Sequence, residues 1–238
     1  MPLTVVFAAR FNGPPGSANG GYACGLIAQQ VPANLVEVTL RRPPPLDTTL
    51  FVDRTAEHYS VYLNSGDIIA VAEPVGEPIT ADPVVVDIPA EAPSALPDDR
   101  HPFRTCFTCG PDRVPRDGLR IFAKRIPGQP VLADRWTPDQ SLADNDGSVR
   151  PEIVWASLDC PGGWAAFDRI PGGVAVLGRM TAQVDRPPVV GEPSVVIASS
   201  RWRDGRKIDA HSALYTCEGE LLAAARAMWI DVTPRGTG

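Results

Sequence analysis

The sequence is short of basic residues and has no long hydrophobic run. It contains 22 Lys and Arg against 28 Asp and Glu, which gives a formal net charge of -6. A general nucleic-acid-binding protein normally carries a basic surplus, so we expect no nucleic-acid partner. A membrane-spanning helix needs about 18 consecutive apolar residues, and no segment approaches that length. The first ten residues have no basic residue ahead of their apolar ones, so they do not resemble a signal peptide.

Several catalytic and cofactor motifs are also missing. There is no GxSxG elbow, because Gly16 to Gly20 has the wrong spacing, and there is neither a P-loop nor a GxGxxG loop. We therefore expect no cofactor. The five cysteines are an odd number for a disulfide framework, and they favour reduced thiols and a cytoplasmic location.

Proline is abundant, with 26 residues, and its clusters divide the chain. The segment 81–100 is rich in proline and acidic residues, and its one strand-like run is Val84–Val86. Proline cannot donate to a helix or a sheet ladder, so we interpret this segment as an extended connector. It separates an N-terminal unit, 1–80, from a C-terminal unit, 101–238. Apolar residues make up 44% of the chain, enough for a packed core in each unit.

The two units carry the same signatures in the same order. Arg42-Pro43-Pro44 in the first unit corresponds to Arg186-Pro187-Pro188 in the second. Further along, the glycine turn and apolar run 66–72 correspond to 219–225. Each Arg-Pro-Pro turn follows an apolar segment that contains glycine, 19–31 in the first unit and 151–166 in the second. This order predicts one helix and several strands in each unit, repeated once.

The periodicity of apolar residues predicts antiparallel strands and enclosed helices. In the second unit Val176, Met180 and Ala182 are predicted on one face of a strand, and Leu177 on the other. The helix that begins near Pro151 is apolar on nearly every side, so it must be covered all round. We therefore expect an α+β fold with two antiparallel sheets, each wrapped around a central helix and fused in one chain. Glycines in the first helix would allow another element to approach closely.

This pattern resembles a double hotdog, and the second unit resembles the hotdog-fold acyl-CoA thioesterases. Cys106 to Pro111, followed by Gly118-Leu119, is similar to the "CFxCG…GL" entry of many such proteins. The segment 149–159 is similar to the family's central helix, and 177–232 to its strand block. In the first unit 11–22 resembles the same helix entry, with Asn19 where the family often has histidine.

The resemblance implies hydrolysis of an acyl-CoA or another acyl thioester. Such a reaction needs a carboxylate that activates water or attacks directly, and backbone N–H groups that bind the developing oxyanion. A helix N-terminus supplies free N–H groups. We therefore predict a catalytic site made of Asn19, Gly20 and Gly21 from the first helix with Asp159 from the second.

The two helices are not equivalent, so only one complete site is expected per chain. Where the second helix has Asp159, the first has Ala28 beside Gln29, and where the first has Gly20-Gly21, the second has Pro151-Glu152. Proline has no N–H to donate. Asp159 could instead cap a helix break at 161–163, Asn19 could be a simple N-cap, and Glu152 is the alternative acid.

The substrate is expected to contact residues near both helices and a basic hairpin. The acyl chain would run between the helices, near Tyr22, Trp155 and Leu158, and Arg203 and Arg206 could meet the phosphates of coenzyme A. The alternatives are a non-catalytic acyl-binding protein and a hydratase or dehydratase on the same fold. Stacking of two fused pairs is common in the resembled family, so a homo-oligomer of double-hotdog protomers stays open.

The cysteines are expected to be structural. Cys106 and Cys109 form a CxxC with His101 upstream, but a zinc site normally needs four ligands and no second CxxC exists. We therefore expect no metal, and a turn packed against the second unit. Cys160, although next to Asp159, is expected to be a buried thiol.

Overall fold

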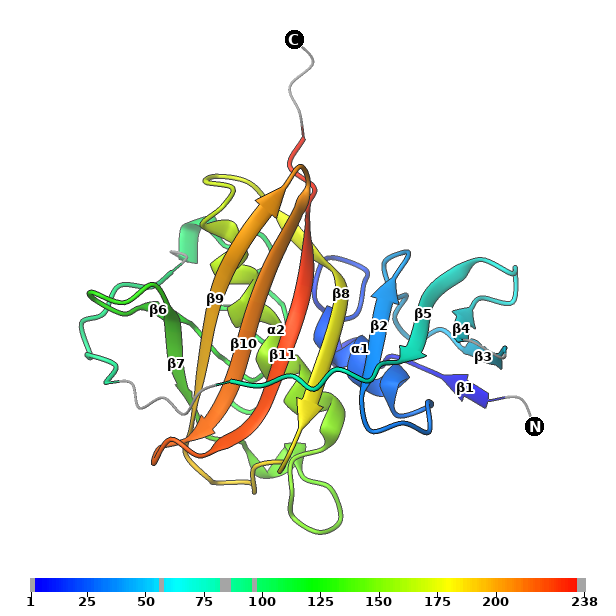
Figure 1. The fold of residues 1–238 in the computed structure, drawn as a ribbon, viewed down its shortest axis with the longest axis horizontal. Coiled ribbons are helices and arrows are strands. Elements are labelled where there is room, and N and C mark those ends of the chain that lie inside the picture. Colours follow the sequence, from blue (N-terminus) through cyan, green and yellow to red (C-terminus); the bar gives the residue numbers. More distant parts are fainter. Residues whose placement is uncertain (1–2, 56–57, 82–86, 96–97, 235–238) are drawn as a thin grey trace.

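The computed structural model describes residues 3–55, 58–81, 87–95 and 98–234. These residues form two α-helices, three 3-10 helices and one eleven-stranded sheet (Figure 1). The first half contains β1 (Leu3–Val5), η1 (Ala9–Phe11), α1 (Gly20–Ala28), β2 (Val36–Leu40), β3 (Leu50–Arg54), β4 (Tyr59–Tyr62) and β5 (Ile68–Pro74). The second half contains η2 (Asp98–Arg100), β6 (Lys124–Arg125), β7 (Leu132–Trp136), η3 (Gln140–Leu142), α2 (Pro151–Phe167), β8 (Ala175–Val184), β9 (Ser194–Asp204), β10 (Lys207–Thr216) and β11 (Leu221–Asp231).

The strand order repeats on the two sides of the β2–β8 contact. The order is β1-β3-β4-β5-β2-β8-β11-β10-β9-β7-β6, with antiparallel neighbours throughout. After β2 and after β8, the first strand that follows each helix, two consecutive amides donate to one carbonyl: those of Arg41 and Arg42 to Ile69, and those of Asp185 and Arg186 to Leu222. The two glycine turns also match, since Gly66 has a φ of 86° and Gly219 a φ of 90°. The sequence repeat is therefore a repeat of backbone structure.

The expectation of two separate sheets was wrong. β2 and β8, the first strands after each helix, pair along their edges, with Val36 opposite Ala182 and Val38 opposite Met180. An edge strand exposes a row of unpaired backbone groups, and this pairing removes two such edges at once. The sequence gives no local sign of which edges meet, because that depends on how the two halves dock.

Helix α2 is buried along nearly its whole length, as its apolar composition predicted. Every residue from Glu152 to Ala166 is buried, and the sheet, α1 and the segment 103–123 enclose it. The helix continues through Pro161, so there is no break at 161–163 for Asp159 to cap. Within the described ranges, no helix combines the length and the apolar character needed to cross a membrane.

The predicted faces of β8 were partly wrong because the strand contains a bulge. Arg179 pairs with Met228, but Leu177 pairs with Trp229, so Gly178 is an extra residue on β8. An extra residue shifts the alternation of side chains by one. Leu177 therefore faces the same core as Met180, on the side opposite to the one predicted.

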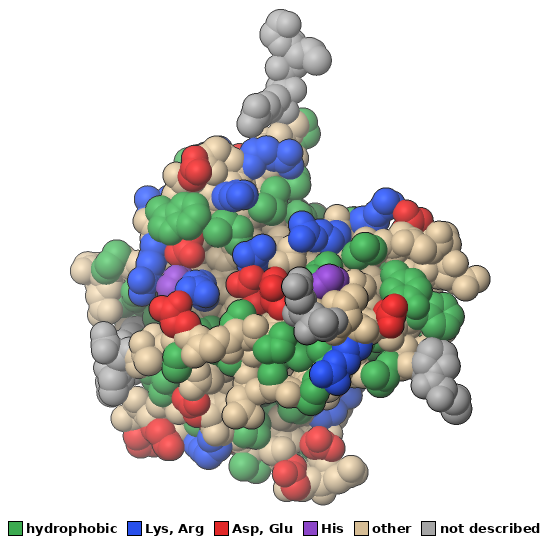
Figure 2. Space-filling view, turned by 45° about the vertical axis from the view of Figure 1, so that its right-hand side comes forward, with side chains coloured by type: hydrophobic (Ala, Val, Ile, Leu, Met, Phe, Trp, Pro, Cys, Tyr) green, Lys and Arg blue, Asp and Glu red, His purple; other side chains and the backbone are tan. Residues whose placement is uncertain are grey.

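The segment 75–81, which follows β5 and leads into the connector, crosses the outer face of the sheet (Figure 1). The Ile79 amide donates to Gln183 at 3.1 Å, and the side chain of Ile88 is buried among residues of β7, β9 and β10. Val84–Val86, the predicted strand-like run, lies outside the described residues. Figure 2 shows acidic, basic and apolar side chains mixed on one face of the molecule, without the continuous basic stripe of a nucleic-acid-binding surface among the residues drawn in colour.

The carboxylate of Asp134 in the sheet is expected to make the stability of the protein depend on pH. Burial raises the pKa of Asp134 in β7 to about 6, while amide donors from Phe122 and Arg135 act against that rise. The folded protein therefore holds this proton more tightly than the unfolded chain between about pH 4 and pH 6, and stability falls as pH rises through that window. Asp134→Asn should raise the free energy of unfolding at pH 8 by about 1 to 3 kcal/mol, and by much less at pH 4. Urea unfolding at the two pH values measures the difference.

Asp146→Asn is the matched control. Hydrogen bonds from Ser148 lower the pKa of Asp146, so its charge is favoured in the folded state. Its removal should not stabilise the protein at pH 8. Equal effects of the two substitutions would contradict the burial of Asp134 as the cause.

Candidate active site

The N-terminus of α1 and the middle of α2 meet through a hydrogen bond between side chains. Asn19 is the N-cap of α1, and its Oδ1 accepts from the Tyr22 amide at 2.9 Å. Its Nδ2 donates to Oδ2 of Asp159 at 2.8 Å. One side chain therefore caps its own helix and orients the carboxylate of the other helix. Both residues are buried, with 2% of each exposed.

Asp159 is a buried carboxylate that is only half satisfied. Burial raises its pKa to about 7, while the nearby Gly21 amide and the hydrogen bond from Asn19 act in the opposite direction. Its Oδ1 atom has no hydrogen-bond partner among the described residues. A buried carboxylate oxygen without a hydrogen-bond partner lowers the stability of the fold, so its presence points to a role other than packing.

A cavity of about 330 Å³ opens beside this pair. Asn19, Gly20 and Asp159 contribute polar groups to its wall, and Trp164, Phe167 and Leu177 contribute apolar ones. The Gly20 amide is the first of α1 and has no hydrogen-bond partner in the described part of the chain. The cavity thus combines an apolar wall, a free helix-start N–H and a carboxylate, the features of a small-molecule site.

The space between the two helices is filled, so the predicted path of an acyl chain is not seen there. A Cβ on Gly21 would lie 2.5 Å from Cβ of Asp159, and one on Gly25 would lie 2.8 Å from Cβ of Trp155. Tyr22 stacks on Phe11 with ring centroids 4.1 Å apart. Tyr22, Trp155 and Leu158 are buried in the core and do not line the cavity.

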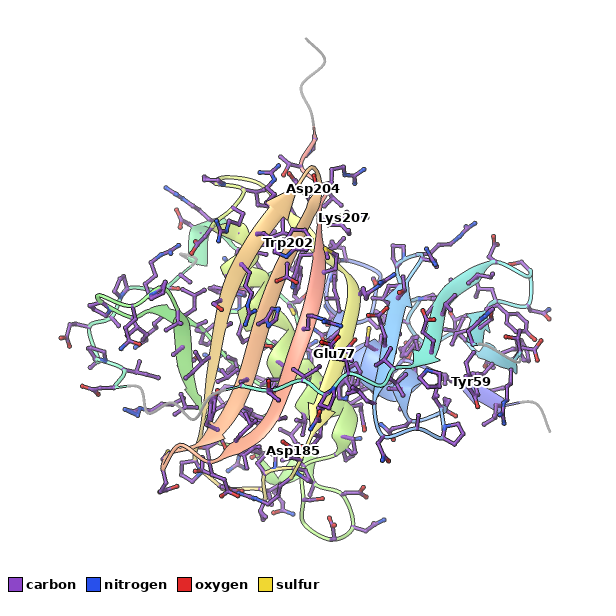
Figure 3. All side chains as sticks on the ribbon, viewed as in Figure 1. Tyr59, Glu77, Asp185, Trp202, Asp204 and Lys207 are labelled. Atoms are coloured by element: carbon purple, nitrogen blue, oxygen red, sulfur yellow. The ribbon has the colours of Figure 1, made fainter. Side chains whose placement is uncertain are left out.

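The arginines at the cavity are not the two singled out from the sequence. Arg41 and Arg42, at the first Arg-Pro-Pro turn, line it. Arg203 donates to the Arg169 carbonyl at 2.7 Å and pairs with Asp231, and Arg206 donates to the Asp231 carbonyl at 2.8 Å. Figure 3 shows the end of this β9–β10 hairpin, marked by Asp204 and Lys207, at one end of the sheet. The hairpin is adjacent to the cavity strand β11 but is not part of the wall.

The position related to this site by the repeat contains a buried carboxylate with partners for both oxygens. Gln29 Nε2 donates to Oε2 of Glu152 at 3.0 Å, and Arg150 lies 3.5 Å from Oε1. Both oxygens of this second buried carboxylate therefore have partners, in contrast to Asp159.

Comparison with solved structures identifies the fold. The sequence matches no protein-family model and no curated protein. Among solved structures it is similar to the tesB protein of Mycobacterium avium subspecies paratuberculosis, with 17% identity, a TM-score of 0.61, and 98% of this chain and 92% of that chain covered. Acyl-CoA thioesterase II TesB2 of Mycobacterium marinum gives 16% identity, a TM-score of 0.57, and coverage of 93% and 92%. A conserved hotdog-fold protein of unknown function from Alicyclobacillus acidocaldarius gives 12% identity, a TM-score of 0.59, and coverage of 98% and 93%. The chain has the hotdog fold.

Three cysteines line the same cavity of this hotdog protein. Cys106 and Cys109 come from the segment before β6, and Cys160 follows Asp159 on α2. Hydrogen bonds from Cys109 and Cys160 hold the pKa of the Cys106 thiol well below its usual range, whereas burial raises that of Cys109. His101 Nε2 lies 3.3 Å from Sγ of Cys109. Sequence reasoning did not place Cys160 beside the CxxC.

Sequence reasoning also missed the apolar wall and the arginines at the cavity. Trp164, Phe167 and Leu177 carry no motif, and the bulge at Gly178 moved Leu177 to the cavity side. Arg41 and Arg42 did carry a signal, because they begin the Arg-Pro-Pro turn that repeats in the second half. That repeat was interpreted only as a strand end.

Proposed function

We propose that this protein is a thioester hydrolase built as a double hotdog, with one active site per chain. The observation that carries the proposal is the pairing of two unsatisfied groups at one cavity: Oδ1 of Asp159 and the amide of Gly20. A base and an oxyanion donor on opposite helices are what hydrolysis of a thioester requires. The equal strand order of the two halves supports the double hotdog.

In the proposed reaction Asp159 acts on a water molecule. Oδ2 stays bound to Asn19, and Oδ1 accepts a proton as the water oxygen attacks the thioester carbon. The carbonyl oxygen gains negative charge, which the Gly20 N–H and the positive end of α1 stabilise. Collapse of the tetrahedral intermediate breaks the carbon–sulfur bond. The thiolate leaves and takes up the proton, which gives a carboxylic acid and a free thiol.

The cavity suggests where the acyl group and the coenzyme A portion of an acyl-CoA would bind. The acyl group would lie against Phe167 and Leu177, within the 330 Å³ space. The phosphates of coenzyme A would lie outside the cavity, near Arg41 and Arg42 of its wall. Arg41 is exposed and has no ion pair among the described side chains, whereas Arg42 pairs with Asp67 at 2.9 Å.

A panel of acyl-CoA thioesters tests the proposed function. The purified protein should release free thiol, detected by a chromogenic disulfide reagent, from at least one short or aromatic acyl-CoA. Tight binding without release, measured by calorimetry on the same panel, would instead establish the non-catalytic acyl-binding alternative. The similar structures whose names include thioesterase support hydrolysis. Asn19, and not a histidine, donates to Asp159, which argues against the hydratase or dehydratase alternative.

Arg41→Ala tests where the phosphates bind. The substitution should raise KM for an acyl-CoA about tenfold, because it removes one charge-assisted contact. The KM for the matching acyl-pantetheine, which has no adenosine phosphates, should change little. Steady-state kinetics with both substrates measures the difference.

Arg203→Ala is the matched control for this experiment. Arg203 is already engaged by Asp231 and by the Arg169 carbonyl, so its removal should leave both KM values nearly unchanged. A larger increase in KM for Arg203→Ala than for Arg41→Ala would place the phosphate site at the β9–β10 hairpin, as predicted from the sequence.

A further inference from the structure

Three buried thiols gather at one point of the cavity wall. The Sγ atoms of Cys106, Cys109 and Cys160 all lie within 4.8 Å of one another, and those of Cys106 and Cys160 are 3.6 Å apart. Three sulfurs in a tetrahedral zinc site are about 3.8 Å apart, since each Zn–S bond is about 2.3 Å. The three side chains are therefore arranged as a metal would require, with adjustments of less than about 1 Å.

The loop that carries two of these cysteines is a tight turn closed by backbone hydrogen bonds. The Cys106 amide donates to the Phe103 carbonyl at 2.9 Å, and the Gly110 amide donates to the Cys106 carbonyl at 2.8 Å. A Cβ at Gly110 would lie 2.6 Å from the Cys106 amide nitrogen and from its carbonyl oxygen, so only glycine allows the turn to close this tightly. The CxxCG sequence thus forms a tight turn that holds the sulfurs of Cys106 and Cys109 near each other.

Side-chain donors complete the surroundings of the sulfurs. Asn19 Nδ2 lies 3.7 Å from Sγ of Cys106 and 3.8 Å from that of Cys160. Neutral thiols are weak acceptors, whereas thiolates need N–H donors. A group of three thiolates without a cation would be strongly repulsive in a buried position. This environment is therefore built for thiolates that share a positive ion.

His101 is an outer donor in this arrangement. Its Nδ1 accepts from the Phe103 amide at 3.1 Å, and a backbone amide always carries a proton. The ring proton must then be on Nε2, which points at Sγ of Cys109 from 3.3 Å. His101 thus stabilises a thiolate ligand in the manner of an outer hydrogen bond to a metal site.

We propose that Cys106, Cys109 and Cys160 bind one zinc ion through three thiolates, with the fourth coordination position facing the cavity. Thiolates select thiophilic ions, and Zn²⁺ takes such ligands without a change of oxidation state. Each thiol that becomes a ligand releases its proton, so binding releases up to three protons per ion. The site joins the 103–123 segment to α2, so the ion also fixes that segment on the helix beside Asp159. The proposal does not depend on thioester hydrolysis.

Metal analysis of the wild-type protein is the first test. After purification under reducing conditions and dialysis, elemental analysis should find about one zinc per chain. The cobalt-substituted protein should show sulfur-to-cobalt charge-transfer bands and the intense visible bands of a tetrahedral site. Three results would overturn the proposal: less than a tenth of an equivalent of metal with all thiols reactive, a disulfide between Cys106 and Cys160 found by mass spectrometry under non-reducing conditions, or a cobalt spectrum without thiolate bands.

Variants locate the ligands. Cys106→Ser, Cys109→Ser and Cys160→Ser should each lower zinc affinity at least tenfold, whereas the exposed Cys217→Ser and the buried Cys24→Ser should retain the metal. Because a ligand variant can fail to fold, release of zinc from the wild-type protein by a mercurial reagent is measured in parallel. His101→Ala should keep the ion with about 10- to 100-fold weaker affinity. Complete loss of metal in His101→Ala would contradict its place outside the ligand set, and retention in all three ligand variants would overturn the site.

Discussion

Asp159→Asn is expected to lower the rate of thioester hydrolysis by about 100- to 10,000-fold, the range for removal of a general base. Asparagine has nearly the same shape, and its side-chain oxygen can still accept from Asn19, which now donates to the carboxylate at 2.8 Å. The amide cannot take a proton from water. The loss should therefore appear in kcat, with little change in KM or in the melting temperature. Thiol release with the best acyl-CoA measures both constants.

Glu152→Gln is the matched control, because it removes the other buried carboxylate of α2. Glu152 is bound by Gln29 and Arg150, and it does not line the cavity. Its rate should stay within a few-fold of the wild type. If Glu152→Gln removed activity while Asp159→Asn kept it, the proposed base would be wrong and the mirror position would be the active one. Zinc content should be unchanged in Asp159→Asn, so failure of the catalytic proposal is distinguishable from failure of the metal proposal.

The sequence predicted the parts of the fold that depend on short stretches of chain. The Arg-Pro-Pro turns and the glycine turns recur at equivalent backbone positions because proline ends a strand locally and because positive φ favours glycine. The nearness of Asn19 and Asp159 was also predictable, since two related helices that pack face to face bring the start of one to the middle of the other. The hydrogen bond between them follows from that packing. Their catalytic roles stay a prediction.

The rest depended on contacts between distant parts of the chain. The two expected sheets form one sheet because β2 and β8 pair with each other. The alternation of side chains in β8 differs from the predicted one because of a bulge opposite Trp229. No spacing rule brings Cys160 to Cys106, since they are separated by 54 positions and lie on different elements. A motif search for four nearby ligands therefore excluded a metal, while the fold gathers three of them from two segments.

These distant contacts all converge on the junction of the two helices. Asn19 links α1 to Asp159 and lies within 4 Å of two cysteine sulfurs, so one side chain touches both the proposed base and the proposed metal site. The geometry of both sites then depends on how closely the helices approach. That distance is set by Gly21 and Gly25 of α1, neither of which lines the cavity.

Gly21→Ala is expected to lower the free energy of unfolding by about 2 to 3 kcal/mol, even though alanine favours helix by up to about 1 kcal/mol. The new Cβ would lie 2.5 Å from Cβ of Asp159 and 2.6 Å from the Trp155 carbonyl oxygen. Both atoms belong to the helix framework, so the helices must separate. The Gly21 amide would then move from Asp159, and hydrolysis should fall together with stability. Chemical denaturation and thiol release on the same preparation measure the two effects.

Gly162→Ala is the control that separates the effect of the close contact between the helices from the effect of helix propensity. Gly162 is also inside a helix, but the nearest atoms to its Cβ would be 3.6 Å and 3.8 Å away, an ordinary van der Waals contact. This substitution should be neutral or should stabilise the protein by up to about 1 kcal/mol. If both variants behaved alike, the distance between α1 and α2 would not be set by glycine, and the link between helix packing and the position of Asp159 would be lost. If only Gly21→Ala is destabilised, the contact between the helices is what holds the carboxylate at the start of α1.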